Sequence, residues 1–223
     1  MKNYLPVRSS NTLNEKSDNL FDCFQLKMLL TIVDRDGTLI EFVTYLGKEE
    51  DWKDKTKLNF PVVRLLKYVQ DNHLAKIYIV SNQAGVARKY FSCSRVDEIN
   101  RYINEKLVDL GIRIDGWHYC PDVDNNYTKL HPETDFDIKF VKERTNRKPS
   151  INMVLATLNQ DNLKLSLFKK IFVIGDAEDD EKLAENLKGM YIDIKEKTYK
   201  QLKEEFLAFV NKRKNEEGFS FRE

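Results

Sequence analysis

Short apolar runs alternate along this chain with longer stretches in which apolar residues recur at helical spacing. The apolar runs lie at residues 28–33, 77–80, 112–119 and 171–174, with a weaker one at 190–194. Short apolar runs between amphipathic helices are typical of strands that are buried on both faces. The helical stretches begin at Pro61 and then cover residues 94–110, 151–158, 179–187 and 199–212. This order predicts an α/β fold, a Rossmann-like, doubly wound parallel sheet with helices on both faces.

Polar residues follow the apolar runs where the predicted strands end. Asp34, Ser81, Cys120 and Asp176 stand at the ends of the first four runs. The carboxyl ends of parallel strands meet at one edge of a sheet, and ligands bind there in folds of this kind. We therefore expect the chemically active residues of this chain to gather at that edge.

The composition is that of a globular chain with little net charge. The 223 residues include 37 basic and 36 acidic side chains, and 41% of the residues are hydrophobic. Such a balance gives no strong field toward nucleic acid or an anionic membrane. We predict a flexible leader at residues 1–22, a single domain at 23–213 and a tail at 214–223. Length favours one domain, and the polar ends carry no apolar period.

Location and assembly are expected from the same features. No apolar run approaches the length of about 20 residues that a membrane span needs. The three scattered cysteines do not suggest a disulfide framework and fit a reducing compartment. We expect a cytoplasmic monomer that does not bind membranes.

The first polar cluster, Asp34-Arg35-Asp36-Gly37-Thr38, is the most informative. Two carboxylates at the end of a buried strand are costly unless they are paired or bind a metal ion. One of them can attack phosphorus, and the other can protonate a leaving oxygen. A solvated surface turn is the structural alternative.

Three further groups are weaker when each is taken alone. The Ser81 hydroxyl and the backbone N–H groups of residues 81–85 could bind phosphate oxygens, or this segment could be an ordinary polar turn. The basic pair Arg147 and Lys148 could neutralise a phosphoryl group or could be solvated. Asp176, in an acidic stretch after a strand, suits a hard cation such as Mg²⁺; an acidic first helical turn is the alternative.

Together the four groups resemble the motifs of the haloacid dehalogenase superfamily of phosphohydrolases. Within it, the chain is similar to the histidinol-phosphatase and heptose-bisphosphate-phosphatase branch. This similarity rests on residues 34–40, 45–47, 81–88, 115–121 and 147–149. The resemblance implies a fold without a large cap domain, in which a long loop, here residues 122–146, reaches over the site.

The resemblance also implies roles for the acidic residues. Asp34 would be the nucleophile and a Mg²⁺ ligand. Asp36 would act as general acid and then as base, with its backbone carbonyl on the metal. Asp176 would complete the protein ligands, and Asp180 would support the metal side or orient Lys148.

Four other residues would bind the phosphate or the rest of the substrate. Ser81 and Lys148 would hold the transferring phosphate, and Asn82 and Arg147 would contact phosphate or substrate. All four roles follow from the resemblance.

The zinc loop that many members of this branch carry is incomplete here. Cys120-Pro121 remains, but Arg144 and Asn146 stand at two expected cysteine positions. Cys120 and the distant His131 cannot form a closed tetrahedral site. We predict no structural zinc.

Three functions remain open from the sequence. The first is a Mg²⁺-dependent phosphomonoesterase that forms an aspartyl-phosphate and acts on a small phosphorylated metabolite, of the sugar phosphate or histidinol phosphate type. The second is a polynucleotide 3′-phosphatase acting on DNA ends, which shares the fold and lacks zinc; the neutral charge disfavours it. The third is a non-catalytic binding protein, which the retained acidic and basic residues disfavour.

Overall fold

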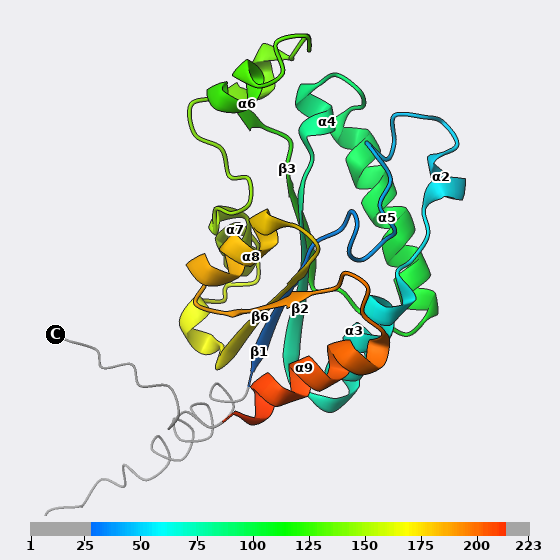
Figure 1. Ribbon diagram of the computed structural model, residues 1–223, viewed down its shortest axis with the longest axis vertical. Coiled ribbons are helices and arrows are strands. Elements are labelled where there is room, and N and C mark those ends of the chain that lie inside the picture. The colour runs from blue at the N-terminus through cyan, green and yellow to red at the C-terminus, as the bar shows by residue number, and fades with distance from the viewer. Residues whose placement is uncertain (1–27, 213–223) are drawn as a thin grey trace, which may run out of the picture.

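The computed structural model describes residues 28–212, which form a five-stranded parallel sheet between two layers of helices (Figure 1). The strand order is β3-β2-β1-β6-β7. The strands are β1 (Leu29–Val33), β2 (Ala75–Asn82), β3 (Gly116–Cys120), β6 (Lys170–Gly175) and β7 (Met190–Asp193). All four strand pairs are parallel, so every carboxyl end lies at the same edge.

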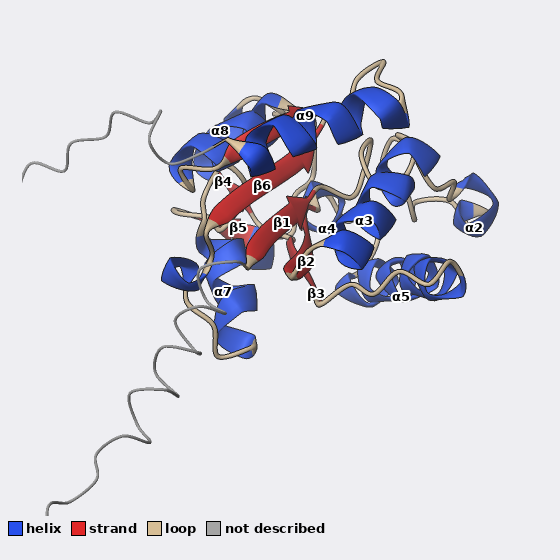
Figure 2. Cartoon of the chain, turned by 90° about the horizontal axis from the view of Figure 1, so that it is seen from below, coloured by secondary structure: helices blue, strands red, loops and turns tan. Residues whose placement is uncertain are grey.

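Helices cover both faces of the sheet, as Figure 2 shows. One face packs on α3 (Phe60–Asn72), α5 (Cys93–Asp109) and α9 (Tyr199–Asn211), and the other on α7 (Asn152–Gln160) and α8 (Glu178–Asn186). Successive side chains of a strand point to opposite faces. Leu29 and Val33 of β1 therefore enter the first core, while Leu30 and Ile32 enter the second. The predicted doubly wound α/β fold is confirmed.

The predicted strands and long helices are all present, with shifted ends. The largest shift is in β3, which begins at Gly116 and not at Ile112. Ile112 is buried, but it packs against the core from the turn that follows α5. Its apolar character therefore reflects burial in a loop and not pairing in the sheet.

The predicted leader and tail lie outside the described residues. Within residues 28–212, no helix is both long enough and apolar enough to cross a bilayer.

The segment 122–146, predicted as a long loop, contains several short elements. These are β4 (Val123–Asp124), α6 (Asn125–Lys129), the 3-10 helix η1 (Ile138–Phe140) and β5 (Val141–Lys142). Val123, Tyr127, Phe136 and Phe140 pack on α4 (Ala84–Ala87) through a small apolar cluster. Elements of two to five residues are too short to produce a periodic pattern, so the sequence could not predict them.

Three short elements complete the described part of the chain. They are α2 (Trp52–Lys55), α4 and the 3-10 helix η2 (Leu165–Leu167). Figure 1 shows α6 beside α4, at the end of the molecule toward which β3 runs.

We expect Thr31→Val to stabilise the protein by about 1–2 kcal/mol. Thr31 is fully buried in the central strand, and its Oγ1 meets no hydrogen-bond partner within residues 28–212. Valine keeps the shape and removes the unsatisfied hydroxyl. The matched control is Thr157→Val, because the buried Thr157 hydroxyl donates to the Met153 carbonyl at 2.8 Å. Urea denaturation should show a gain in unfolding free energy for Thr31→Val only; equal changes would contradict the argument.

Candidate active site

The turn after β1 presents Asp34 at the carboxyl edge of the sheet. The Asp34 N–H donates to the Ile174 carbonyl of β6 at 3.0 Å, and its own carbonyl accepts from the Leu39 N–H at 3.2 Å. The chain reverses at Gly37, which has φ +87°. A left-handed backbone of this kind suits glycine, since it has no Cβ. Asp34 is thereby fixed between two central strands.

Lys148 joins two buried carboxylates below the surface of this edge. Its Nζ donates to Asp180 Oδ1 at 2.6 Å and also to Asp34 Oδ1. The lysine backbone is held by Asn82, whose Oδ1 accepts from the Lys148 N–H at 2.9 Å and whose Nδ2 donates to the Lys148 carbonyl at 3.2 Å. Asn82 also donates to Asp179 Oδ2 at 3.2 Å. The ends of β1 and β2, the Lys148 segment and α8 are thus connected through one group of side chains.

Asp176 lies beside this pair and completes an acidic cluster. Thr38 Oγ1 donates to Asp176 Oδ1 at 3.0 Å. Carboxylate oxygens of Asp34, Asp176 and Asp180 all lie within 4.8 Å of one another. Three carboxylates around the one ammonium of Lys148 leave excess negative charge, and all the potential metal ligands are hard oxygens. This set fits Mg²⁺, which prefers carboxylate oxygen.

Burial and neighbouring charges together shift the pKa values of Asp34, Asp176 and Lys148. Burial raises the pKa of Asp34 to about 7. Lys148 opposes this rise in the pKa, whereas the negative charges of Asp180 and Asp36 add to it. Burial also raises the pKa of Asp176, and the bond from Thr38 counteracts part of that rise. Burial alone would lower the pKa of Lys148, yet Asp34 and Asp180 together hold it above its usual value. The lysine therefore stays charged.

Asp36 is held separately from this cluster by a buried arginine. Arg35 donates from Nε to Asp36 Oδ1 at 3.0 Å and from Nη2 to Oδ2 at 2.8 Å. Its Nη1 donates to Asn100 Oδ1 of α5 at 2.8 Å. Gln83 Nε2 donates to Asp36 Oδ2 at 2.7 Å and also to Ser81 Oγ. In this structure the bonds orient the Asp36 carboxylate toward Arg35 and Gln83.

A pocket of about 310 Å³, which we call the site pocket, opens next to Asp36. Arg147 lies on its wall, with its guanidinium 5.2 Å from the centre of the Tyr127 ring. The residues that line it are Asp36, Phe42, Val43, Thr44, Tyr45, Leu46, Asn82, Gln83, Ala84, Gly85, Phe91, Tyr127 and Arg147. The wall thus combines aromatic rings with a few polar groups, as in many small-molecule sites.

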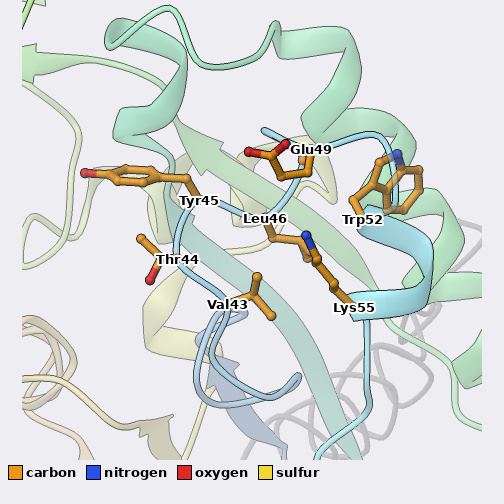
Figure 3. Close-up of a pocket in the computed structure, with 8 residues that line it drawn as sticks. Val43, Thr44, Tyr45, Leu46, Glu49, Trp52 and Lys55 are labelled. Carbon is orange, nitrogen blue, oxygen red and sulfur yellow. The ribbon is translucent and has the colours of Figure 1, made fainter.

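Figure 3 shows a second cavity, which lies along the loop that carries Tyr45. It is lined in part by Leu46 and Trp52 and has a volume of about 30 Å³. That is room for about two water molecules. The Tyr45 ring extends away from Trp52 in this view, and Tyr45 also lines the site pocket. The small cavity is therefore not a substrate site.

The structure sorts the residues predicted from the sequence into two groups. Asp34, Lys148 and Asp180 are buried together, with the half-buried Asp176 beside them, and Asp36, Asn82 and Arg147 line the site pocket. Ser81 is buried and accepts from Gln83.

The sequence interpretation missed the supports of Asp36. It gave no role to Arg35, Gln83 or Asn100. Arg35 precedes Asp36 directly and Gln83 follows Ser81 by two residues, and this proximity in the sequence was the available signal. Asn100 lies on a helix that pairs with Arg35 only after folding, and the sequence carries no signal for it.

We expect Gly37→Ala to weaken Mg²⁺ binding at least tenfold. A Cβ at residue 37 would lie 2.5 Å from Asp176 Oδ2 and would push this carboxylate aside. Gly111→Ala is the matched control, since Gly111 has φ +70° but its nearest neighbour, a lysine side chain, would be 3.6 Å away. Both variants should lose about 1–2 kcal/mol from backbone strain. The Mg²⁺-dependent rise in melting temperature should shrink for Gly37→Ala alone, and equal responses would contradict this assignment.

Comparison with known proteins identifies related phosphatases. Residues 30–211 match the family model described as polynucleotide kinase 3 phosphatase. A probable D-glycero-D-manno-heptose-1,7-bisphosphate 7-phosphatase of Thermoplasma acidophilum is 29% identical over 156 residues, covering 70% of this chain and 82% of that protein. The D-glycero-D-manno-heptose-1,7-bisphosphate 7-phosphatase of Chlorobaculum tepidum is 30% identical over 147 residues, covering 63% of this chain and 66% of that protein.

A solved structure has the same fold. It is the D,D-heptose 1,7-bisphosphate phosphatase from B. bronchiseptica complexed with magnesium and phosphate, with a TM-score of 0.56 and 18% identity. The match covers 74% of this chain and 79% of that chain. At this level of identity the similarity shows the fold alone.

Proposed function

Because the chain belongs to the polynucleotide kinase 3 phosphatase family and is a phosphatase of the haloacid dehalogenase superfamily, we propose that it hydrolyses a small phosphorylated metabolite through Asp34. One observation carries this proposal. The buried Asp34 lies in an acidic cluster beside Lys148, and Asp36, two residues further on, faces a pocket large enough for a leaving group.

The first step transfers the phosphoryl group to Asp34. An Asp34 carboxylate oxygen attacks phosphorus, and the bond between phosphorus and the ester oxygen breaks. Asp36 donates its proton to the departing oxygen, which leaves as an alcohol. Asp36 lines the site pocket and Asp34 does not, so the leaving group would occupy the pocket while the phosphorus lies over Asp34.

The second step regenerates the enzyme. A water molecule attacks the phosphorus of the phosphoaspartate, Asp36 accepts the water proton, and the bond to Asp34 breaks to release inorganic phosphate. For Asp36 to act as an acid in the first step, its carboxyl group must carry a proton and turn away from the two donors of Arg35. Gln83 can keep its bond to Ser81 during this turn.

Charge on the phosphoryl oxygens must be neutralised for a carboxylate to approach. Lys148 supplies one positive charge at Asp34. Mg²⁺, held by Asp34, Asp176 and, as the resemblance implies, the Asp36 carbonyl, would supply the rest of the charge stabilisation. Asp180 keeps Lys148 in place through the 2.6 Å bond. Ser81, Asn82 and Arg147 would contact the phosphate or the remainder of the substrate.

Two related observations support a sugar phosphate as the substrate. The relatives quoted above are named as heptose bisphosphate phosphatases. The site pocket, at about 310 Å³, is within the range of small-molecule sites. Arg147 offers donors to hydroxyl or anionic groups on such a sugar.

The family description favours a second candidate, a polynucleotide 3′-phosphatase. The aromatic rings of the site pocket would stack on bases at a strand end. The net charge of +1 gives little general attraction for a phosphate backbone. No comparable observation favours a non-catalytic role.

Phosphate release tests the proposal. The panel contains heptose 1,7-bisphosphate, hexose phosphates, histidinol phosphate, nucleotides and a 3′-phosphorylated oligonucleotide, each with Mg²⁺ or with EDTA. We expect Mg²⁺-dependent turnover with preference for a sugar phosphate. Preference for the oligonucleotide would favour the second candidate. No release from any phosphoester by a folded, Mg²⁺-binding protein would contradict both.

A further inference from the structure

Arg88 is a buried cation whose surroundings in the described chain contain no carboxylate partner. The residue is only 7% exposed, and within residues 28–212 no acidic side chain forms an ion pair with it. Its neighbour Lys89, by contrast, is exposed and pairs with Asp135 at 2.7 Å. Burial of an unpaired charge is costly unless other interactions offset it. The groups around Arg88 therefore have to supply the interactions that offset the cost of burying its charge.

Aromatic rings and hydroxyl groups surround the Arg88 guanidinium. Its central carbon lies 5.6 Å from the ring centre of Tyr45, 5.2 Å from that of Tyr127 and 5.6 Å from that of Phe136. Arg88 Nε donates to the Tyr127 hydroxyl at 3.2 Å, and Nη1 donates to Thr134 Oγ1 at 3.0 Å. Ring faces attract a cation within about 6 Å.

These partners come from two segments that are far apart in the sequence and meet around Arg88. Tyr45 belongs to the loop that follows the Asp34 turn, while Tyr127, Thr134 and Phe136 belong to segment 122–146. The small apolar cluster and the 2.8 Å bond from the Asp137 N–H to the Ala87 carbonyl also hold that segment, but both act against α4. Neither of these two anchors includes the Tyr45 loop. Arg88 contacts both the Tyr45 loop and segment 122–146.

Two of the three rings form the wall of the site pocket. Tyr45 and Tyr127 line it, whereas Arg88 lies behind them and outside it. We propose that Arg88 is a positioning residue that determines which leaving groups the phosphatase accepts, because its guanidinium joins the Tyr45 loop to segment 122–146 and so shapes the pocket. This inference rests on the proposed function, in which the pocket holds the leaving group.

The geometry requires arginine and not merely a positive charge. The planar guanidinium stacks on rings and donates in several fixed directions at once, whereas a lysine ammonium is a compact charge on a flexible stem. Arg88→Lys should therefore lose much of the link between the Tyr45 loop and segment 122–146. Methionine has a similar length but neither the charge nor the donors, so Arg88→Met should lose this link completely.

The matched control is Arg64→Met. The guanidinium of the exposed Arg64 lies 4.3 Å from the ring centre of Tyr199, far from the catalytic turn in the sequence and outside the lining of the site pocket. The Arg64→Met substitution thus removes an arginine–aromatic contact of the same kind without changing the lining of the site pocket. Circular dichroism and melting temperature identify any variant that fails to fold. If Arg88→Met does not fold, the conservative variant Arg88→Lys is tested in its place.

The first readout is independent of activity. Trypsin can cleave segment 122–146 after Lys129, Lys139, Lys142 or Arg144. We expect cleavage there, followed by mass spectrometry, to be at least tenfold faster in Arg88→Met than in the wild type, intermediate in Arg88→Lys and unchanged in Arg64→Met. If trypsin cleaved segment 122–146 of Arg88→Met no faster than that of the wild type, the proposal would be overturned, even if no substrate had been found.

The second readout distinguishes binding of the leaving group in the site pocket from the rate of phosphoryl transfer. With heptose 1,7-bisphosphate, KM of Arg88→Met should rise at least tenfold, while kcat changes less than threefold. With acetyl phosphate, whose acyl group is too short to fill the pocket, kcat/KM should stay within threefold. Equal losses on both substrates would overturn the positioning role. If the wild type hydrolyses acetyl phosphate alone, the sugar phosphate assignment fails, and the proteolysis result still decides the role of Arg88.

Discussion

Lys148→Met should lower the free energy of unfolding by about 3–5 kcal/mol, since it leaves buried carboxylates without their cation. Lys148 is 5% exposed and is the shared hydrogen-bond donor of Asp34 and Asp180. Phosphatase turnover should fall on the order of 10²- to 10³-fold in the folded fraction, because a positive charge at the reacting group is lost. Urea denaturation in EDTA and phosphate release with Mg²⁺ measure the two effects.

The control for this variant is Lys182→Met. Lys182 pairs with Glu178 at 2.5 Å, but both side chains are exposed on α8, so its removal should leave the unfolding free energy almost unchanged. Mg²⁺ should restore part of the stability of Lys148→Met, since the added cation replaces some of the missing positive charge. Similar stability losses in the two lysine variants would refute the central role of the buried cluster.

Asp34→Asn is expected to reduce turnover by on the order of 10⁴-fold or more, because the nucleophilic oxygen is lost. Asparagine has the same shape and can still accept from Lys148, so the fold should persist. Single-turnover phosphate release, with Asp179→Asn as a control acidic substitution in the same region, measures the effect. Asp179 supports Asn82 through one 3.2 Å bond, so that variant should lose less than Asp34→Asn. Residual activity of Asp34→Asn within tenfold of the wild type would exclude Asp34 as the nucleophile.

The same substitution should change the pH dependence of stability. The pKa of Asp34 is about 7 in the folded protein, against an ordinary value of 3.8, so the folded state holds the proton more firmly than the unfolded state. Its contribution to stability is complete below pH 3.8 and is lost as the pH rises through about 7. In EDTA, the wild type should therefore become less stable over this window, and Asp34→Asn should show a flatter curve. Denaturation at about pH 5 and about pH 8, on either side of the folded pKa, tests this difference.

The strands could be predicted because their burial is encoded in short apolar runs. Leu30, Ile32 and Val33 are fully buried between two helical layers, where a polar side chain would need a partner of its own. The Asp34 and Asp176 pair could be predicted for a related reason. Each aspartate follows such a run, and parallel strands bring those ends to one edge.

The rest of the site depends on side-chain orientations that no local pattern records. The two donors that Arg35 gives to Asp36 depend on a rotamer fixed by Asn100, which lies 65 residues away. Tyr127 reaches the pocket from a helix of five residues, too short for a helical period. The walls of the pocket could therefore be identified only in the folded chain, whereas the sequence alone predicted that Asp34 and Asp176 lie at one edge of the sheet.

The sharing of Lys148 between two carboxylates has a consequence for substrate binding. An ammonium group has three N–H donors, and the bonds to Asp34 and Asp180 occupy two of them. The third can donate to an incoming phosphoryl oxygen while neither carboxylate is released. The site would then bind its substrate without rearranging the lysine, so the entropy of fixing that side chain is already lost during folding and does not weaken binding.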